Sequence, residues 1–277
     1  MEWIILLVIL VVFVLLIAYG YSQNFMMKTE YYRIAAEHVS APKRLVLLSD
    51  LHGNCMGKEN KKLLEEIDRQ RPDAVCVAGD MTIKNGKGAE EAVTLMAKLT
   101  KKYPVYYAPG NHEIRMPDYK NFRTELKETG VIYLENEWAS LADGYVIGGL
   151  DLPEYWYHKC WNIRRMECSD LKKIMGEPPK KKFIILIAHN PEYFPQYADF
   201  GAELVLSGHI HGGIARLPFL GGVISPSLRL FPTYDAGMFK WGKSHMVLTR
   251  GLGLHHIKLR FFNRPELSVI DIERKNR

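Results

Sequence analysis

The sequence predicts an α/β fold in which helices cover the faces of a sheet. Three observations indicate this class: short apolar segments alternate with amphipathic ones between residues 44 and 130, several apolar segments end in polar clusters, and no internal repeat is present. A chain of 277 residues, 47% hydrophobic and 25% charged, suits one large domain or at most two small ones with a substantial core.

The expected elements follow from these patterns. Three strands are expected, each followed by an amphipathic helix. The strands are at 44–50, 73–80 and 104–113, and the helices that follow them are at 60–70, 88–102 and 119–130. Short strands with few helical spacers are expected afterwards, at 131–136, 138–142, 145–151, 181–190, 202–211, 244–253 and 266–272. We therefore divide the chain into an anchor at 1–22, a stalk with a leading strand at 23–42, and a globular body at 43–277.

The first segment predicts one transmembrane helix. Residues 4–18, IILLVILVVFVLLIA, are uncharged and apolar, and with their flanks they approach the roughly 20 residues that span a bilayer. Trp3 precedes this run and Tyr19 and Tyr21 follow it, as expected for aromatic side chains at the two membrane surfaces. A buried core helix and a cleaved signal peptide are the alternatives, although no Lys or Arg precedes the run.

The basic residues near the anchor bear on its orientation. Lys28, Arg33, Lys43 and Arg44 all follow the apolar run. Positive charge favours the cytoplasmic side, so we expect a single-pass protein of the cell membrane with a cytoplasmic body. An extracytoplasmic body is the alternative, because Glu30 and Glu37 lie among these residues.

The net charge of +6 is a modest excess, and the Lys and Arg residues are scattered. A solvated basic surface or a preference for anionic partners explains such a balance. No nucleic-acid-binding motif is present, so no nucleic-acid partner is expected. The four cysteines form no C-x-x-C pair, which argues against a zinc ribbon.

Polar side chains gather where five predicted strands end. Five of the ten histidines lie there, and in open α/β sheets sites form beyond the carboxyl ends of strands. Imidazole, carboxylate and amide oxygen without thiolate suit Mn, Fe or Zn. The candidate ligands at these strand ends are Asp50, His52, Asp80, Asn111, His112, His189, His209 and His211.

The ordered pattern of these residues resembles the calcineurin-like metallophosphoesterases. Their signature, D-x-H, G-D, G-N-H-[D/E], H and G-H-x-H, stands here in order at 50–52, 79–80, 110–113, 189 and 208–211. Segments such as SDLHGN at 49–54 and LSGHIHGG at 206–213 look like the membrane-anchored branch, which includes phosphodiesterases and lipid-processing pyrophosphatases. The resemblance covers about residues 43 to 272 and implies a four-layer α/β/β/α sandwich.

The resemblance also implies a role for each motif residue. Asp50, His52 and His211 would bind one divalent ion, Asn111, His189 and His209 would bind a second, and Asp80 would bridge them. Manganese is the expected metal, with iron or zinc as alternatives.

His112, beside Asn111, would act as the general acid that protonates the leaving group. Glu113 stands where many relatives have aspartate, and it is expected to set the tautomer of His112. Ile83 replaces a second aspartate of the wider family, which is not a ligand there.

The segment 153–170 is a candidate lid over the metals. Its aromatic and basic side chains would contact a base, an acyl chain or a second phosphate. An ordinary surface loop is the alternative reading. The candidate substrate residues are Trp156, Trp161, Arg164 and Arg165.

Together these observations predict a membrane-anchored, two-metal hydrolase that cleaves a phosphodiester or pyrophosphate bond of a lipid-linked, amphiphilic or nucleotide substrate. A phosphomonoesterase with the same centre is the first alternative. A non-catalytic anchored scaffold is the second, although a decayed site would lack several ligands and this chain lacks none.

Overall fold

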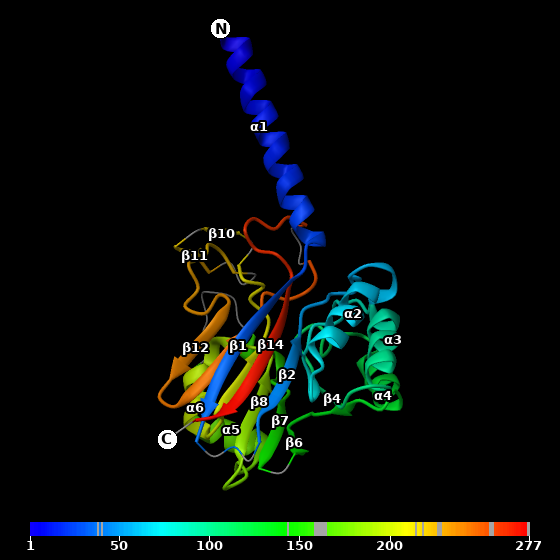
Figure 1. Ribbon diagram of the computed structural model, residues 1–277, viewed down its shortest axis with the longest axis vertical. Helices are drawn as coiled ribbons and strands as arrows, with labels where there is room; N and C mark the ends of the chain where they lie inside the picture. The colour runs from blue at the N-terminus through cyan, green and yellow to red at the C-terminus, as the bar shows by residue number, and fades with distance from the viewer. Residues whose placement is uncertain are drawn as a thin grey trace.

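The computed structural model describes residues 1–37, 39, 41–142, 144–157, 165–213, 215–217, 219–225, 229–254 and 258–275. These residues form a body of two stacked sheets with helices on both outer faces, from which one helix, α1 (Glu2–Ser22), projects (Figure 1). The prediction of an α/β/β/α sandwich preceded by one apolar helix is confirmed.

The first sheet has six strands. Its order is β1 (Lys28–Ala36), β14 (Glu266–Arg274), β2 (Lys43–Leu48), β3 (Ala74–Ala78), β4 (Val105–Ala108) and β5 (Ile132–Tyr133). Strands β2 to β5 pair in parallel, whereas β14 runs antiparallel to β2 and parallel to β1.

The second sheet also has six strands. Its order is β12 (Gly237–Trp241), β13 (Ser244–Leu248), β9 (Leu204–Ser207), β8 (Phe183–Ala188), β7 (Tyr145–Leu150) and β6 (Glu137–Ala142). The four central strands are parallel and the two edge strands are antiparallel to them. A separate pair consists of β10 (Arg216–Leu217) and β11 (Gly221–Gly222).

Helices cover the outer face of each sheet. Those on the first sheet are α2 (Lys61–Gln70), α3 (Ala89–Leu99) and α4 (Tyr119–Glu128), and those on the second are α5 (Cys168–Met175) and α6 (Phe194–Phe200). Short 3-10 turns lie at Gln23–Phe25, Lys58–Asn60, Glu154–Trp156 and Pro191–Tyr193. Helix α2 shows why these segments are helical: Leu63 and Ile67, four residues apart, are buried on one face.

The four layers enclose three apolar cores. Strand β2 explains the continuous apolar runs, because alternate side chains point to opposite faces of a strand. Val46 and Leu48 pack toward the helices of the first layer, while Leu45 and Leu47 pack toward the second sheet. A strand buried on both faces needs apolar residues at every position.

The expected stalk contains a strand of the body. Within residues 23–42, β1 pairs with β14 over nine residues, from Lys28↔Glu266 to Ala36↔Arg274. The sheet therefore begins before residue 43. The division of the chain at residues 22 and 42 stays a prediction.

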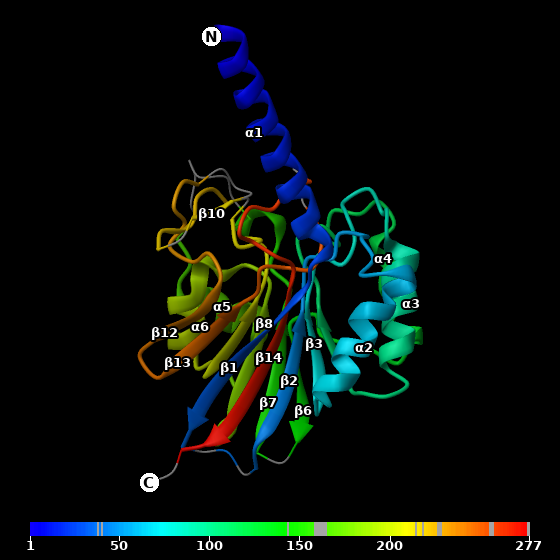
Figure 2. The same ribbon diagram turned by 45° about the horizontal axis from the view of Figure 1, so that its top comes forward.

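The carboxyl ends of the parallel strands face the end of the body from which α1 leaves. Strand β1 begins at Lys28, a few residues after α1, and Lys28 is level with Glu266 on β14. Two residues further along β14, Ser268 is level with Leu47, near the carboxyl end of β2. The foot of α1 and the end of β2 are therefore at the same end of the molecule (Figure 2).

Candidate metal centre

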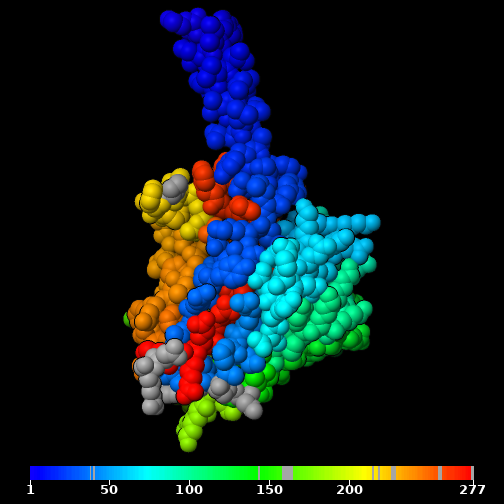
Figure 3. Space-filling view, in the orientation of Figure 1, coloured from blue at the N-terminus to red at the C-terminus, as the bar shows by residue number. Residues whose placement is uncertain are grey.

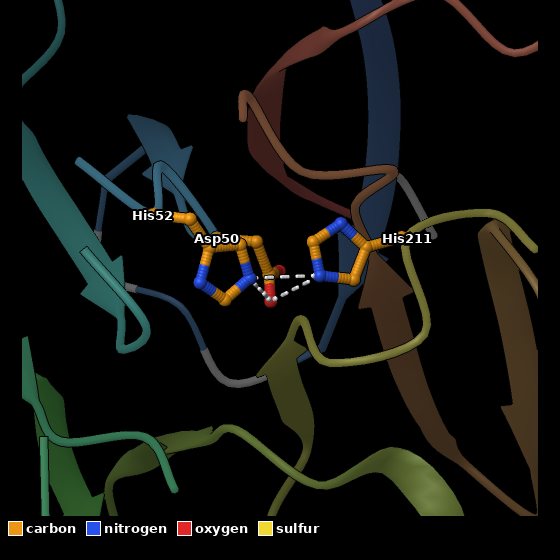
Figure 4. A group of neighbouring side chains, drawn as sticks. All are labelled: Asp50, His52 and His211. Atoms are coloured by element: carbon orange, nitrogen blue, oxygen red, sulfur yellow. Dashed lines mark hydrogen bonds and ion pairs between the residues drawn. The ribbon is translucent and has the colours of Figure 1, made fainter. Parts of the chain in front are cut away.

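The predicted ligands converge between the two sheets. The Oδ1 atom of Asp50, after β2, lies 3.4 Å from Nε2 of His211 and 3.9 Å from Nε2 of His52. The Nε2 atoms of the two histidines are 2.9 Å apart, so three ligand-type atoms face one point (Figure 4). This arrangement suits one divalent cation, which His52 from the first sheet and His211 from the second would hold jointly.

A second group lies beside the first. The Nε2 atom of His189, after β8, is 3.0 Å from Oδ2 of Asp80 and 3.9 Å from Oδ1 of Asp50. One ligand atom each of Asp80, His189 and His209 lie within 4.8 Å of one another, and the same holds for His52, Asp80 and His112. Asp80 thus belongs to two groups, which is the placement that a bridging carboxylate requires.

Asn111 provides an independent indication of a cation. Its side chain is buried, and among the described residues its Oδ1 atom has no hydrogen-bond partner. A buried amide oxygen without a partner is costly, because it has lost its bonds to water. A metal ion at this position would satisfy it, so the donor set present fits the two ions that the sequence predicts.

The loops that carry the ligands have unusual backbone conformations. Five of the seven predicted ligands have positive φ angles: Asp50 (55°), His52 (49°), Asp80 (54°), His209 (77°) and His211 (56°). Asx and His residues tolerate this region better than most, but the conformation is still uncommon. Strain of this kind persists where surrounding contacts impose it, and it concentrates at functional sites.

Glycines let these loops approach closely. A Cβ atom on Gly208 would lie 2.0 Å from Oγ of Ser49, and one on Gly110 would lie 2.3 Å from Oδ1 of Asp80. At these two positions only a residue without a Cβ atom lets the neighbouring loops come this close. Both sheets can therefore present their strand ends to the same small volume.

Glu113 has a different role from the one expected. Its buried carboxylate accepts hydrogen bonds from the backbone N–H groups of Asp80 (2.8 Å), Met81 (2.7 Å) and Gly110 (2.9 Å) and from the Tyr107 hydroxyl (2.9 Å). It therefore does not orient the ring of His112. The longer glutamate instead reaches under the loops after β3 and β4 and fixes them together, which makes it a positioning residue.

The backbone sets the tautomer of His112. Its Nδ1 atom accepts a hydrogen bond of 3.2 Å from the N–H of Lys84, so a neutral ring carries its proton on Nε2. The ring lies edge-on to His52, with 4.6 Å between centroids. His112 thus has a defined tautomer at the edge of the ligand cluster.

The buried charges of the cluster shift one another's pKa values. Burial raises the pKa of Asp80, but the charge and hydrogen bond of His189 outweigh it and hold that pKa well below its usual value. Burial lowers the pKa of His189, and Asp80 more than reverses this and raises it to about 9. Burial raises the pKa of Asp50 to about 6. A cation would favour the charged form of Asp50 and the neutral form of His189.

Of the four candidate substrate residues, the structure describes Trp156 and Arg165. Trp156 is 3% exposed and packs into the core against Tyr193, with ring centroids 5.4 Å apart, so it does not face the site. Its neighbour Tyr157 does, with its ring 5.4 Å from His209 and 6.1 Å from His189. Arg165 is exposed, and Trp161 and Arg164 lie outside the described residues.

Two residues that support the metal loops belong to no motif identified in the sequence. Asn263 is buried, and its Nδ2 donates to the carbonyl oxygens of His211 (2.7 Å) and Gly213 (2.5 Å). Arg260 is also buried and donates to the carbonyls of Arg250, Gly251, Gly253 and Asn263. Gly253 in turn donates its N–H to the carbonyl of Asp50 at 2.7 Å, so residues 250–253 and 260–263 together support the loops that carry Asp50 and His211.

Comparisons with known proteins agree with this geometry. The profile of the family described as calcineurin-like phosphoesterase matches residues 43–213. The chain is 27% identical over 221 residues to the uncharacterized metallophosphoesterase YkuE of Bacillus subtilis, covering 78% of this chain and 73% of that one. It is 26% identical to the phosphodiesterase YaeI of Escherichia coli, covering 84% and 83%.

A vertebrate relative shares both the domain and a membrane-related name. The transmembrane protein with metallophosphoesterase domain of Danio rerio is 26% identical over 243 residues, covering 82% of this chain and 52% of that one. Together with the apolar helix α1, such relatives indicate a membrane protein. Because the family profile spans more than half of the chain and ends just past the loop that brings His209 and His211 to the cluster, this protein belongs to the calcineurin-like phosphoesterases.

Proposed function

We propose that the protein is a membrane-anchored hydrolase that uses two divalent ions to cleave a phosphodiester or pyrophosphate bond. The observation that carries this proposal is the position of Asp80, whose carboxylate belongs to one ligand group with His189 and His209 and to another with His52 and His112. Two ions, one beside Asp50, His52 and His211 and the other beside His189 and His209, with Asp80 shared between them, would neutralise charge on the transferred phosphoryl group and supply a nucleophile at neutral pH.

The side chains of the protein have separate tasks in this scheme. The Asp50 and Asp80 carboxylates bind and hold the ions, and the Glu113 carboxylate keeps the loops after β3 and β4 in register. The Nε2–H of His112 donates a hydrogen bond to the departing oxygen and stabilises its developing charge, since the Lys84 N–H occupies Nδ1 and the ring is neutral. Tyr157 covers the side of His189 and His209 and limits the access of water.

The name of YaeI supports a phosphodiester over a monoester, and the mixed imidazole and oxygen ligands support manganese. The length and apolar composition of α1 support anchoring in a membrane. Basic residues after α1 support a cytoplasmic body. A lipid-linked or amphiphilic substrate stays a prediction from the sequence.

The test uses the full chain in detergent, stripped of metal and supplied with Mn²⁺. Hydrolysis of bis-p-nitrophenyl phosphate and of p-nitrophenyl phosphate would be compared for the wild type, Asp80→Ala and Asp73→Ala. Asp73 pairs with Lys43 on the surface and is the matched control. We expect diester turnover in the wild type and the control, and a loss of about 10³-fold or more in Asp80→Ala, because several kcal/mol of charge stabilisation disappear.

Other outcomes separate the alternatives. Faster hydrolysis of the monoester would favour a phosphomonoesterase. Activity retained in Asp80→Ala would contradict the ligand assignment. Tight metal binding without turnover of either ester would favour the scaffold.

A further inference from the structure

Three phenylalanines outside the metal centre are both exposed and strained. Phe219 is 107% exposed, and Phe231 and Phe262 are each 57% exposed. All three have positive φ angles, of 68°, 47° and 51°. A bulky side chain in this region is a genuine outlier, and an exposed aromatic ring gains nothing from it in water. Strain of this kind is a reason to look for a function.

The three rings belong to one surface. Leu217, Leu220 and Leu230 are exposed beside them, and the six residues form what we call the apolar rim: Leu217, Phe219, Leu220, Leu230, Phe231 and Phe262. Backbone hydrogen bonds connect its parts, from Phe231 to Val223 (2.9 Å) and from Val223 to Ala215 (2.8 Å). Arg216 then donates to the carbonyl of Phe261 at 3.0 Å, next to Phe262.

The apolar rim lies at the foot of α1. In Figures 1 and 2, β10, β11 and the turn before β14 are at the end of the body from which α1 leaves. Figure 3 shows the same segments, in yellow and red, beside the blue helix. The carboxyl ends of the strands that carry the metal ligands point to this end as well.

Contacts with α1 show which turn of that helix the rim lies beside. The rings of Tyr19 and Phe262 have centroids 5.6 Å apart, and those of Tyr19 and Phe261 are 6.4 Å apart. Arg260 donates its backbone N–H to the carbonyl of Gly20 at 3.0 Å. Tyr19 and Gly20 are in the last turn of α1, so Phe262 lies level with the end of the apolar segment.

The charges around the rim fit a lipid surface. The sequences of residues 215–231 and 258–264 contain five Lys or Arg residues and no Asp or Glu, and one of the five, Arg260, is buried. Arg216 and Arg229 pair with Asp235 and Glu192 from other segments, while Lys258 is exposed. Apolar side chains at the tips of turns, with basic residues near them, are typical of segments that enter the boundary between headgroups and acyl chains.

We propose that the apolar rim is a second membrane-contact surface, which inserts into the boundary layer of the bilayer that α1 crosses. This inference rests on the proposed membrane anchor. Insertion moves the exposed rings from water into an apolar layer, which explains why they are at the tips of strained turns. It also holds the body in one orientation, with the metal loops toward the bilayer surface.

The test places spin labels on single cysteines of the full chain in vesicles of phosphatidylcholine and phosphatidylglycerol. Cys55, Cys160 and Cys168 are replaced by serine, and the fully buried Cys76 is kept. Labels at positions 219, 231 and 262 probe the rim. Trp241 is the matched apolar control: it is 47% exposed and is the last residue of β12, level with the first residue of β13 and so at the end of the sheet opposite the carboxyl ends of β9 and β13. Leu10 in α1 is the membrane reference.

We expect the rim labels to shift toward high collision rates with oxygen and low rates with a water-soluble nickel chelate, as at position 10 and unlike position 241. Rim labels that behave like position 241, while position 10 is in the bilayer, would overturn the rim and leave the anchor standing. If position 10 is also exposed to water, the anchor fails and the rim fails with it. Dipolar broadening between rim labels of different molecules, without contact with lipid, would identify a second copy of the chain as the occupant and contradict the proposal.

Discussion

The metal loops and the apolar rim both contain residues with positive φ angles, but they hold them in opposite ways. In the metal loops, buried contacts impose the conformation: Asp50 donates its N–H to Gly79, His52 donates to Asp80, and His209 donates to the Asp50 carboxylate. In the rim, the side chains of Phe219, Phe231 and Phe262 are exposed for more than half of their surface, although the Phe262 ring also contacts Tyr19 of α1. The packing of the body therefore explains the first set of strained residues and not the second.

The two regions would respond differently if the surroundings of their strained residues changed. The metal loops join the two sheets. A shift of one ligand would therefore break hydrogen bonds at the ends of several strands. The rim connects short turns at the surface, and its conformation is of use only if something apolar covers the rings. A buried network thus preserves a catalytic geometry, whereas an exposed one is available for contact with another phase.

The largest effect is expected within the metal loops, where His112 differs from the ligands. It has no positive φ angle, and the Lys84 N–H fixes its ring. We expect His112→Ala to keep its Mn²⁺ content and to lose turnover of the diester by about 10²–10³-fold, because only the hydrogen-bond donor to the departing oxygen is removed. Metal content by mass spectrometry and steady-state kinetics would be measured together. Loss of the metal in this variant would show that His112 is a ligand.

A smaller effect is expected at the junction of the two regions. Asn263 supports the carbonyls of His211 and Gly213, and its neighbour Phe262 is in the rim. We expect Asn263→Ala to weaken Mn²⁺ binding by about 10–100-fold, because the turn that carries His211 loses its support. Phe262→Ala is the matched control and should bind Mn²⁺ as the wild type does. Equal affinities in calorimetric titrations of both variants would argue against a supporting role for Asn263.

The smallest effect is expected in the rim and concerns stability. Phe231 has a φ angle of 47°, at which the Cβ atom of any residue comes too close to the backbone. A glycine at this position would avoid that strain. We expect Phe231→Gly to be more stable than Phe231→Ala by about 1 kcal/mol in detergent, a reversal of the usual order of these residues. Denaturant unfolding of the two variants would measure the difference. An alanine variant as stable as the glycine variant would mean that the turn relaxes without strain.

The sequence by itself determined the class of the fold and the set of ligands to be tested. The alternation of apolar and amphipathic segments reports burial directly. For this reason β3, β4, β8 and β9 and the helices α2, α3 and α4 lie within the predicted segments, and β2 begins one residue before its own. The ligand motifs are also local, because each one follows a strand and the carboxyl ends of parallel strands meet at one edge. The apolar run of α1 is equally plain in the sequence.

Only the tertiary structure decided the contacts that join distant segments. It placed β1 in the first sheet, gave Glu113 to the backbone of the loops rather than to His112, and buried Trp156 while leaving Tyr157 beside His189. It also brought Asn263 and Arg260 against the metal loops and placed the Phe262 ring against Tyr19 at the end of α1. Such roles depend on which partner a side chain meets in space. A periodic pattern records whether a residue is buried, but not what it is buried against.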